Sequence, residues 1–334
     1  MCTVRDNSGN VCLAERILAG DRRAIARLIT LVENEPEAAI KDLQKLYPYT
    51  GKAHIIGITG PPGSGKSTLT DKIAKKIRKT GKTVGIIAVD PTSPFTCGAI
   101  LGDRIRMQEL TMDPGVYIRS MGTRGSLGGL AKATQNAVKI LAAAGMDYII
   151  IETVGVGQSE VDIVKTADTT LVVLVPGLGD DIQAIKAGIL EIADIFVVNK
   201  ADRPEVRRLI AELEMMLDLT HKEKENHWRP PIISTVATKN EGTEQLFLRI
   251  NEHYHYLVKN NELEKRYKAR ISAEIMFLVE EGLKERLLAF WEDEGKIDIL
   301  LDAVATRKTD PYTAAQELLE PFTKIYKERG TKSK

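Results

Sequence analysis

Seven short apolar runs, separated by helical segments, constrain the fold of this 334-residue chain more than any other feature. The runs are continuously apolar and do not alternate with polar residues, so both faces of each strand should be buried, as in a parallel sheet covered by helices. They occupy residues 54–60, 83–90, 115–121, 147–155, 169–177, 192–200 and 231–237. Intervening segments such as 67–80 and 127–144 supply the helices. The pattern predicts an α/β fold with a doubly wound, mainly parallel sheet.

Helical patterns flank this sheet-forming region on both sides. Before residue 50, apolar side chains recur at three-to-four spacing, and Pro36 fits the first turn of a second helix. After residue 258 no strand-like run appears, and Arg270–Trp291 carries apolar residues along one helical face. We therefore predict an N-terminal helical region at 1–50, an α/β domain at 51–258 and a C-terminal helical region at 259–334.

The composition argues against several classes of partner. Lys and Arg number 47 against 46 Asp and Glu, so the formal charge of +1 creates no global attraction to nucleic acid or to an anionic membrane. Aromatic residues make up 5% of the chain, too few to suggest platforms for stacking bases. No apolar run approaches the roughly 20 residues of a membrane span, and the N-terminus lacks the hydrophobic stretch of a signal peptide. We expect a cytoplasmic protein with neither a nucleic-acid nor a membrane partner.

Residues 60–67 read GPPGSGKS and fit the phosphate-loop pattern GxxxxGK[ST]. A buried strand precedes the motif and a helix follows it, which is the context that the motif requires. The glycines let backbone N–H groups turn towards a phosphate, Lys66 reaches the β and γ oxygens, and the Ser67 hydroxyl holds Mg²⁺. The motif predicts a nucleoside triphosphate site. Its expected residues are Gly60, Gly63, Ser64, Gly65, Lys66, Ser67 and Thr68.

A second motif, Asn199-Lys200-Ala201-Asp202, fits NKxD at the carboxyl end of a later strand. The Asp202 carboxylate can accept hydrogen bonds from guanine N1–H and from the exocyclic amine, a pair of donors that adenine does not offer. Lys200 is expected along the base plane, and Asn199 is expected to tie this loop to the phosphate loop. The backbone amides of Thr235, Val236 and Ala237, after the next strand, are expected to face guanine O6. The predicted ligands are GTP and GDP.

Acidic residues at strand ends suggest where Mg²⁺ is held. Glu152 closes a buried run beside the phosphate loop, and the Gly155 N–H could meet the γ-phosphate. Asp90 and Asp103 could join the Mg²⁺ shell through water, although a structural role such as helix capping is an equal alternative for each. The predicted metal residues are Ser67, Asp90, Asp103 and Glu152.

The sequence provides less for hydrolysis itself. The glutamine that orients water in Ras-type GTPases would directly follow Gly155, where Val156 stands. We therefore expect slow intrinsic turnover, raised by a partner or by loop movement. The candidate catalytic residues are Lys66, Glu152, Gln158 and Lys186, with Arg124 as a further candidate; for Lys186 and Arg124 a surface role stays open. The histidines suggest no ligand set, since His253 and His255 point to different faces of one helix.

With these motifs in this order, the chain resembles a known family, the methylmalonyl-CoA mutase-associated GTPases of the MeaB/ArgK type. The resemblance covers about residues 10–325 and rests on GPPGSGKST, VDPTSP, GAILGDRIRM, SMGTRGSLGGLA, ETVGVGQSE and the stretch from VPGLGDDIQ to VVNKAD. It implies a GTPase of the signal-recognition and metallochaperone class that serves an adenosylcobalamin-dependent acyl-CoA mutase, gates its cofactor loading and protects it. It also implies a homodimer formed through C-terminal helices. The family's mobile loop corresponds to residues 177–186 here.

Three alternatives stay open at the level of sequence. A small-molecule or protein kinase would share the phosphate loop but would have no use for a guanine-reading Asp202. A metal-insertion GTPase would need Cys or His ligands near the nucleotide, and none has the required spacing. A signal-recognition GTPase would carry a Met-rich, basic RNA-binding domain, whereas the eight Met of this chain are scattered.

Overall fold

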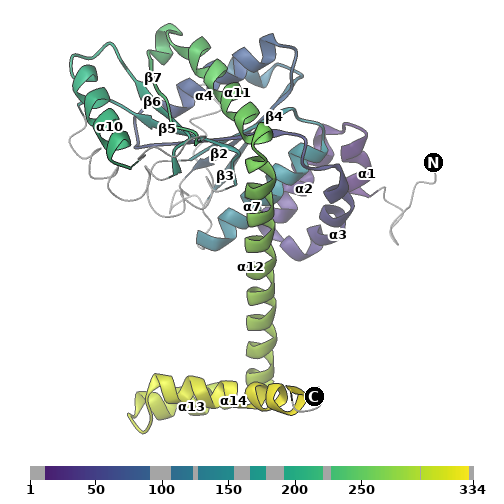
Figure 1. Cartoon of the computed structure of the whole chain (residues 1–334). Coiled ribbons are helices and arrows are strands. Elements are labelled where there is room, and N and C mark those ends of the chain that lie inside the picture. Colours follow the sequence, from purple (N-terminus) through teal and green to yellow (C-terminus); the bar gives the residue numbers. More distant parts are fainter. Residues whose placement is uncertain are drawn as a thin grey trace. The chain divides into compact units, whose positions relative to one another are not determined.

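The computed structural model describes residues 12–90, 107–122, 127–153, 166–177, 192–220, 227–293 and 295–330. They belong to two compact units, with the border between Arg266 and Tyr267 inside one long helix. The first unit contains the sheet together with the N-terminal helices, and the second consists of helices (Figure 1).

A seven-stranded, all-parallel sheet forms the centre of the first unit, which confirms the predicted fold class. All seven apolar runs form strands: β1 (His54–Thr59), β2 (Val84–Asp90), β3 (Val116–Gly122), β4 (Tyr148–Glu152), β5 (Thr169–Leu174), β6 (Ile195–Asn199) and β7 (Ile232–Thr235). Their spatial order is β3-β2-β4-β1-β5-β6-β7. The strand order therefore reverses at β1, whose two neighbours are β4 and β5.

An aspartate placed directly before a strand helps to fix where the strands begin. Asp147, Asp168 and Asp194 precede β4, β5 and β6. Each carboxylate accepts the backbone N–H of a neighbouring chain segment: Asp147 from Thr83 at 2.8 Å, Asp168 from Ile55 at 2.9 Å and Asp194 from Thr170 at 2.9 Å. These bonds satisfy backbone donors at the amino edge of the sheet, where the next ladder bond is missing.

One face of the sheet is covered by α4 (Lys66–Lys79), α6 (Gln108–Thr111) and α11 (Thr243–Lys259). Alternate strand residues point to this face, among them Ile150 of β4 and Leu171 and Val173 of β5. Buried Ile73 and Ile77 of α4 meet them from the helix side. Burial of these side chains explains why the strands contain no polar alternation.

The opposite face carries two separate helical layers. The N-terminal helices α1 (Leu13–Leu18), α2 (Arg22–Asn34) and α3 (Pro36–Leu46) share a core with α7 (Leu127–Ala143) over β2 and β4. The helix α10 (Val206–Thr220) covers β5 and β6 through a second apolar cluster (Figure 1). The N-terminal helices are therefore part of the unit that contains the sheet.

A buried chain of polar side chains lies at the amino edge of the sheet, and we call it the amino-edge network. His54 Nε2 lies 2.8 Å from Thr169 Oγ1, which lies 2.9 Å from His253 Nδ1 of α11. His253 Nε2 is 3.3 Å from Asp194 Oδ1, and Arg266 Nη2 donates to the same oxygen at 2.8 Å. The network thereby fastens the first turn of α12 (Glu262–Asp293) to the start of β6.

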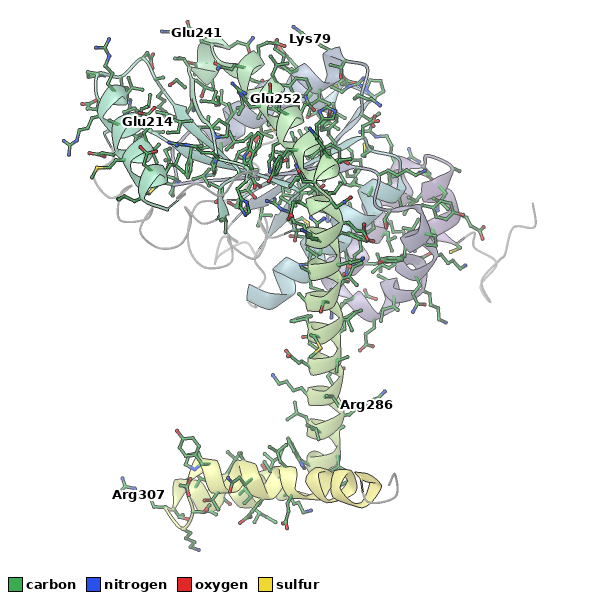
Figure 2. All side chains as sticks on the ribbon, viewed as in Figure 1. Lys79, Glu214, Glu241, Glu252, Arg286 and Arg307 are labelled. Carbon is green, nitrogen blue, oxygen red and sulfur yellow. The ribbon has the colours of Figure 1, made fainter. Side chains whose placement is uncertain are left out.

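The second unit, in contrast, buries very little. It comprises the remainder of α12 with α13 (Lys296–Ala305) and α14 (Pro311–Gly330). Among residues 267–291 and 295–320 only Ala314 is buried, while apolar residues of α12 such as Ile275 and Leu283 are 54% and 55% exposed. Side chains around the labelled Arg286 project outward from the helix (Figure 2). No described helix combines the length and the apolar character needed to cross a membrane.

Candidate functional site: a nucleotide site at the carboxyl edge of the sheet

The phosphate-loop motif lies at the carboxyl end of β1, where the strand order reverses. Ligands of open parallel sheets bind in the crevice at such a reversal. Residues 60–65 form the turn, and α4 begins at Lys66 with Gly65 as its N-terminal cap residue. The N-terminal N–H groups of α4 therefore lie at the end of the loop, as an anion-binding loop requires.

Two glycines of the loop are required by close approach as well as by backbone conformation. At Gly60, with φ of 140°, an added Cβ would lie 2.1 Å from the backbone oxygen of Val173 in β5. At Gly65, with φ of 91°, an added Cβ would lie 2.4 Å from the side-chain nitrogen of Asn199. Both positions favour glycine because other residues rarely adopt such φ values and a side chain would collide.

Lys66 is 6% exposed and is directed back over its own loop. Its ammonium group donates to the backbone oxygens of Gly60 at 2.6 Å and of Pro61 at 3.0 Å. The positive charge is therefore held within the turn, where the oxygens of a bound phosphate would lie. The contact of Lys66 with phosphate oxygens stays a prediction.

Asn199 joins the NKxD loop to the phosphate loop, as predicted. Its side-chain amide donates to the Ser64 backbone oxygen at 2.8 Å. Its side-chain oxygen accepts from Thr235 Oγ1 and from the Ala237 backbone N–H, both at 3.1 Å. A single residue, 2% exposed, thus fixes the loops after β1, β6 and β7 to one another.

The remaining residues of this motif lie at the more exposed end of the site. Lys200 adopts a positive φ of 55°, and its ammonium group donates to the Gly63 backbone oxygen at 2.8 Å. Asp202 forms an ion pair with Lys239 at 3.4 Å, with 47% of the Asp202 side chain exposed. Its carboxylate is therefore accessible to a base, and Lys239 is a neighbour that the sequence analysis did not identify.

Glu152, at the end of β4, reaches the first turn of α4. Its Oε1 accepts a hydrogen bond from Ser67 Oγ at 2.5 Å, and its Oε2 accepts one from Thr70 Oγ1 at 2.8 Å. A hydroxyl and a carboxylate are hard oxygen ligands of the kind that Mg²⁺ prefers, and Mg²⁺ is usually held by one or two protein groups together with phosphate oxygens and water. Ser67 and Glu152 fit that ion. Among the described residues, no three His, Cys, Asp or Glu side chains gather to form a metal cluster.

The sequence analysis missed three threonines around this site. Thr153 Oγ1 donates to Thr59 Oγ1 at 3.0 Å, which joins the end of β4 to the end of β1. Thr70 contacts Glu152 across 82 positions of sequence. Threonine is common in strands and helices, so only its spatial neighbours could reveal these contacts.

Several predicted residues cannot be placed. Asp90 ends β2, where it is in register with Gly122 of β3, but its side chain lies outside the described structure. The positions Asp103, Arg124, Gly155, Gln158 and Lys186 lie outside the described residues. Their roles stay predictions.

The parallel sheet, the phosphate loop and the linked NKxD loop together define the class of the protein: this is the fold of a P-loop GTPase. The family model of the methylmalonyl Co-A mutase-associated GTPase MeaB matches residues 25–292. The chain therefore belongs to this family.

Individual relatives agree with the family. A protein of Pyrococcus abyssi that carries the provisional name GTPase is 55% identical to this chain. The match covers 92% of this chain and 95% of that protein. The GTPase ArgK of Escherichia coli is 31% identical over 91% of this chain and 94% of its own. A mouse protein named methylmalonic aciduria type A homolog, mitochondrial, is 32% identical over 92% of this chain and 78% of its own.

Among solved structures, one resembles most of the chain. The crystal structure of a protein named LAO/AO transport system kinase superposes with a TM-score of 0.70 and 25% sequence identity. The match covers 93% of this chain and 96% of that protein.

Proposed function

We propose that the protein binds GTP and GDP with Mg²⁺, hydrolyses GTP slowly, and acts as a chaperone of an adenosylcobalamin-dependent acyl-CoA mutase. The observation that carries the nucleotide assignment is the double contact of the NKxD loop with the phosphate loop, through Asn199 to Ser64 and through Lys200 to Gly63. A loop that reads guanine must lie at a fixed distance from the loop that binds the phosphates, and these two bonds set that distance.

The roles of the residues follow from this arrangement. The phosphate loop from Gly60 to Thr68 and the ammonium group of Lys66 would bind the phosphates, while Asp202 would accept hydrogen bonds from guanine. Thr235, Val236 and Ala237 would border the base. The N–H groups of Val236 and Ala237, which the sequence led us to expect at guanine O6, instead donate within the chain, to the Glu241 backbone oxygen and to the Asn199 side chain. Ser67 and Glu152 would hold Mg²⁺, which would offset the negative charge of the phosphates.

The proposed hydrolysis depends on Glu152 and on residues that lie outside the described structure. Glu152 is held by two hydroxyls on one helix, which suits a positioning role more than rapid proton transfer. With Val156 at the position of the water-orienting glutamine, we expect the intrinsic rate to be slow. Gln158, Lys186 and Arg124 remain our candidates for groups that a partner would bring to the γ-phosphate.

The first experiment tests the nucleotide. Calorimetric titration should give micromolar or tighter binding of GTP and GDP in the presence of Mg²⁺, with no measurable competition by ATP. A kinase that uses ATP, the alternative suggested by the name of the structural relative, would give the opposite preference. Equal binding of ATP and GTP would contradict the guanine assignment.

The assignment of a mutase as the partner rests on the family description and on the name of the mouse relative. If the nucleotide gates the mutase, GTP must bind with different affinity to the free and the mutase-bound protein. Thermodynamic linkage then requires that the mutase change the affinity for GTP by the same factor, typically about 5–150-fold. A related GTPase with another client, such as a metal-inserting one, would show no such coupling.

The second experiment therefore measures coupling directly. Single-turnover GTP hydrolysis and GTP affinity should be compared with and without an adenosylcobalamin-dependent acyl-CoA mutase of the same organism. Stimulated hydrolysis together with a change in affinity would support the chaperone role. If neither changes while GTP still binds, the client must be another protein.

We also propose that the second unit associates with a second copy of the chain. Its apolar residues Ile275, Leu283 and Phe290 on α12 stay 54%, 55% and 40% exposed in a single copy. Exposed apolar surface of this extent is typical of an interface. Sedimentation equilibrium should give a dimer, and Ile275→Glu combined with Leu283→Glu should give a monomer.

The cytoplasmic location stays a prediction.

A further inference from the structure

The carboxylate of Glu152 is held by two hydroxyl groups of the same helix. Ser67 and Thr70 are three residues apart on α4, so their side chains lie on one face of the helix. Ser67 Oγ donates to Oε1 at 2.5 Å and Thr70 Oγ1 donates to Oε2 at 2.8 Å. Each oxygen of the Glu152 carboxylate therefore accepts a hydrogen bond from a different hydroxyl group.

Thr70 is the member of this trio that no motif predicts. It lies three positions beyond the end of GxxxxGKS and is completely buried, and Glu152 is 5% exposed. A threonine within a helix often donates to the carbonyl four residues before it. Here the hydroxyl instead crosses to β4 and meets an acid that is 82 positions away in sequence.

We propose that Thr70 is a positioning residue that fixes Glu152 for the Mg²⁺ ion that accompanies the nucleotide. The inference rests on the proposed nucleotide function and adds a residue to it. With Oε2 held by Thr70, the oxygen that remains beside Ser67 is Oε1. Ser67 Oγ and Glu152 Oε1 then form a pair of hard oxygens whose orientation does not depend on the ion itself.

The physical reason lies in the torsional freedom of glutamate. Its terminal torsion is broad and roughly two-fold, so an untethered carboxylate would populate several orientations. A hydrogen bond to one oxygen selects a single orientation before the ion arrives. Residues that hydrogen-bond to a metal ligand without touching the metal have a measurable effect in general. Their loss typically lowers the affinity for the metal by about 10–100-fold.

A purely structural role for Thr70 makes a different prediction, and two substitutions separate them. Thr70→Val keeps the shape of the side chain and removes the hydroxyl, whereas Thr70→Ser keeps the hydroxyl and removes the methyl group. If Thr70 only filled space, Ser would be the more harmful change. If Thr70 positions Glu152, Val is the more harmful change.

The experiment measures the Mg²⁺ affinity of the protein–GDP complex, by release of a fluorescent GDP analogue at a series of free Mg²⁺ concentrations. We expect Thr70→Val to weaken Mg²⁺ binding by about 10–100-fold, and Thr70→Ser to remain within about threefold of the wild type. The affinity for GDP in excess EDTA should change by less than about threefold in both variants, because the phosphate loop is intact.

The matched control is Thr134→Val. Thr134 is also completely buried in a helix, α7, but its hydroxyl makes no hydrogen bond within the part of the chain that the structure describes. The same chemical change should therefore leave the Mg²⁺ affinity unchanged. If Thr70→Val does not fold, as judged by thermal melting, Thr70→Ala replaces it in the comparison with Thr70→Ser.

Two failures are distinguishable. If the wild-type protein binds GDP with a clear Mg²⁺ dependence and Thr70→Val retains it within threefold, the positioning role is overturned and the nucleotide function stands. If the wild-type protein binds no guanine nucleotide, or binds it equally with and without Mg²⁺, the proposed function fails and this inference fails with it. A Thr70→Ser variant as weak as Thr70→Val would also overturn the role of the hydroxyl.

Discussion

The two edges of the sheet hold their charged groups in different ways. At the carboxyl edge, the ammonium groups of Lys66 and Lys200 donate to backbone oxygens of the phosphate loop, the same loop that a nucleotide would contact. At the amino edge, the carboxylate of Asp194 is bound by Arg266 and lies beside His253, all within the chain. The carboxyl edge thus directs its cations to a loop that would hold a ligand, whereas the charges of the amino edge pair with one another within the fold. Substitutions should therefore alter affinity at the first edge and stability at the second.

The largest effect is expected at the amino edge. Asp194→Ala would leave the guanidinium of Arg266, whose side chain is 39% exposed, and the buried N–H of Thr170 without their carboxylate partner. Removal of one member of a buried ion pair costs about 3–5 kcal/mol, and we expect the lower end of this range because water can partly hydrate Arg266. Urea unfolding should show this loss.

The chain offers an internal probe for that measurement. It has two tryptophans, and Trp228 Nε1 donates to the backbone oxygen of Asp194 at 2.7 Å. In a Trp291→Phe background, Trp228 fluorescence would report on the first unit. Asp218→Ala, which removes an exposed ion pair with Arg229, is the control and should cost less than about 1 kcal/mol. Equal losses of unfolding free energy in Asp194→Ala and Asp218→Ala would contradict a stabilising role of the amino edge.

At the carboxyl edge, Lys66→Ala should separate affinity from stability. Hydrogen bonds to charged groups contribute about 1.5–3 kcal/mol, so GDP and GTP should bind about 10–100-fold more weakly. The melting temperature without nucleotide should stay close to that of the wild type. Lys79→Ala, at the other end of α4, should retain full affinity (Figure 2). A loss of stability similar to that of Asp194→Ala would mean that the two edges do not differ.

A somewhat smaller effect is expected at the base-reading end. Asp202→Asn replaces an acceptor by a donor, so the preference should shift from GTP towards xanthosine triphosphate. Each two-bond contact with a base edge contributes about 1–3 kcal/mol of discrimination. Competition binding with the two nucleotides measures the shift. Because Asp202 is half exposed, the free energy of unfolding should hardly change in this variant. If the variant still prefers GTP over xanthosine triphosphate, Asp202 is not part of the guanine site.

The smallest effect concerns pH at the amino edge. Burial, with the nearby His253 and His255, lowers the pKa of His54 from 6.5 to about 3. The unfolded chain then binds a proton that the folded chain excludes, so the free energy of unfolding falls as the pH drops from about 7 towards 5. The slope is at most about 1.4 kcal/mol for each pH unit.

His54→Gln tests this pH dependence, because glutamine does not titrate. Its unfolding free energy should fall less steeply than that of the wild type between pH 7 and 5. The window avoids the titration of Asp194. Burial acts to raise the pKa of that carboxyl, but hydrogen bonds from His253 and Arg266 lower it overall, so its own contribution is lost only at more acidic pH. Parallel curves for the two proteins would show that His54 does not control the acid sensitivity.

The sequence predicted the sheet well because both faces of every strand are buried. Continuous apolar runs such as 147–155 and 169–177 have no other simple explanation in a globular protein, and both became strands. The phosphate loop and the NKxD motif were also recognisable, since a turn around a phosphate demands glycines at fixed spacing and a base contact demands one acid at a strand end. These are local requirements, so the local sequence carries them.

Contacts across long stretches of sequence were not predictable. His253 gave no sign of its role, because its partners Thr169 and Asp194 lie on other elements. The pairing of Thr153 with Thr59 and of Asp202 with Lys239 also depends on which strands become neighbours. A single sequence records the residues, but the order of the strands in the sheet decides which of them meet.

The sequence by itself determined the fold class and was enough to recognise the phosphate-loop and NKxD motifs, because each depends on residues that are close along the chain. The tertiary structure alone decided that Asn199 also binds the loop after β7, that Thr70 holds Glu152, and that Arg266 closes the amino edge. The physical reason is that burial and hydrogen bonding act between neighbours in space. A parallel sheet brings together strand ends that are separated in sequence by a helix or more.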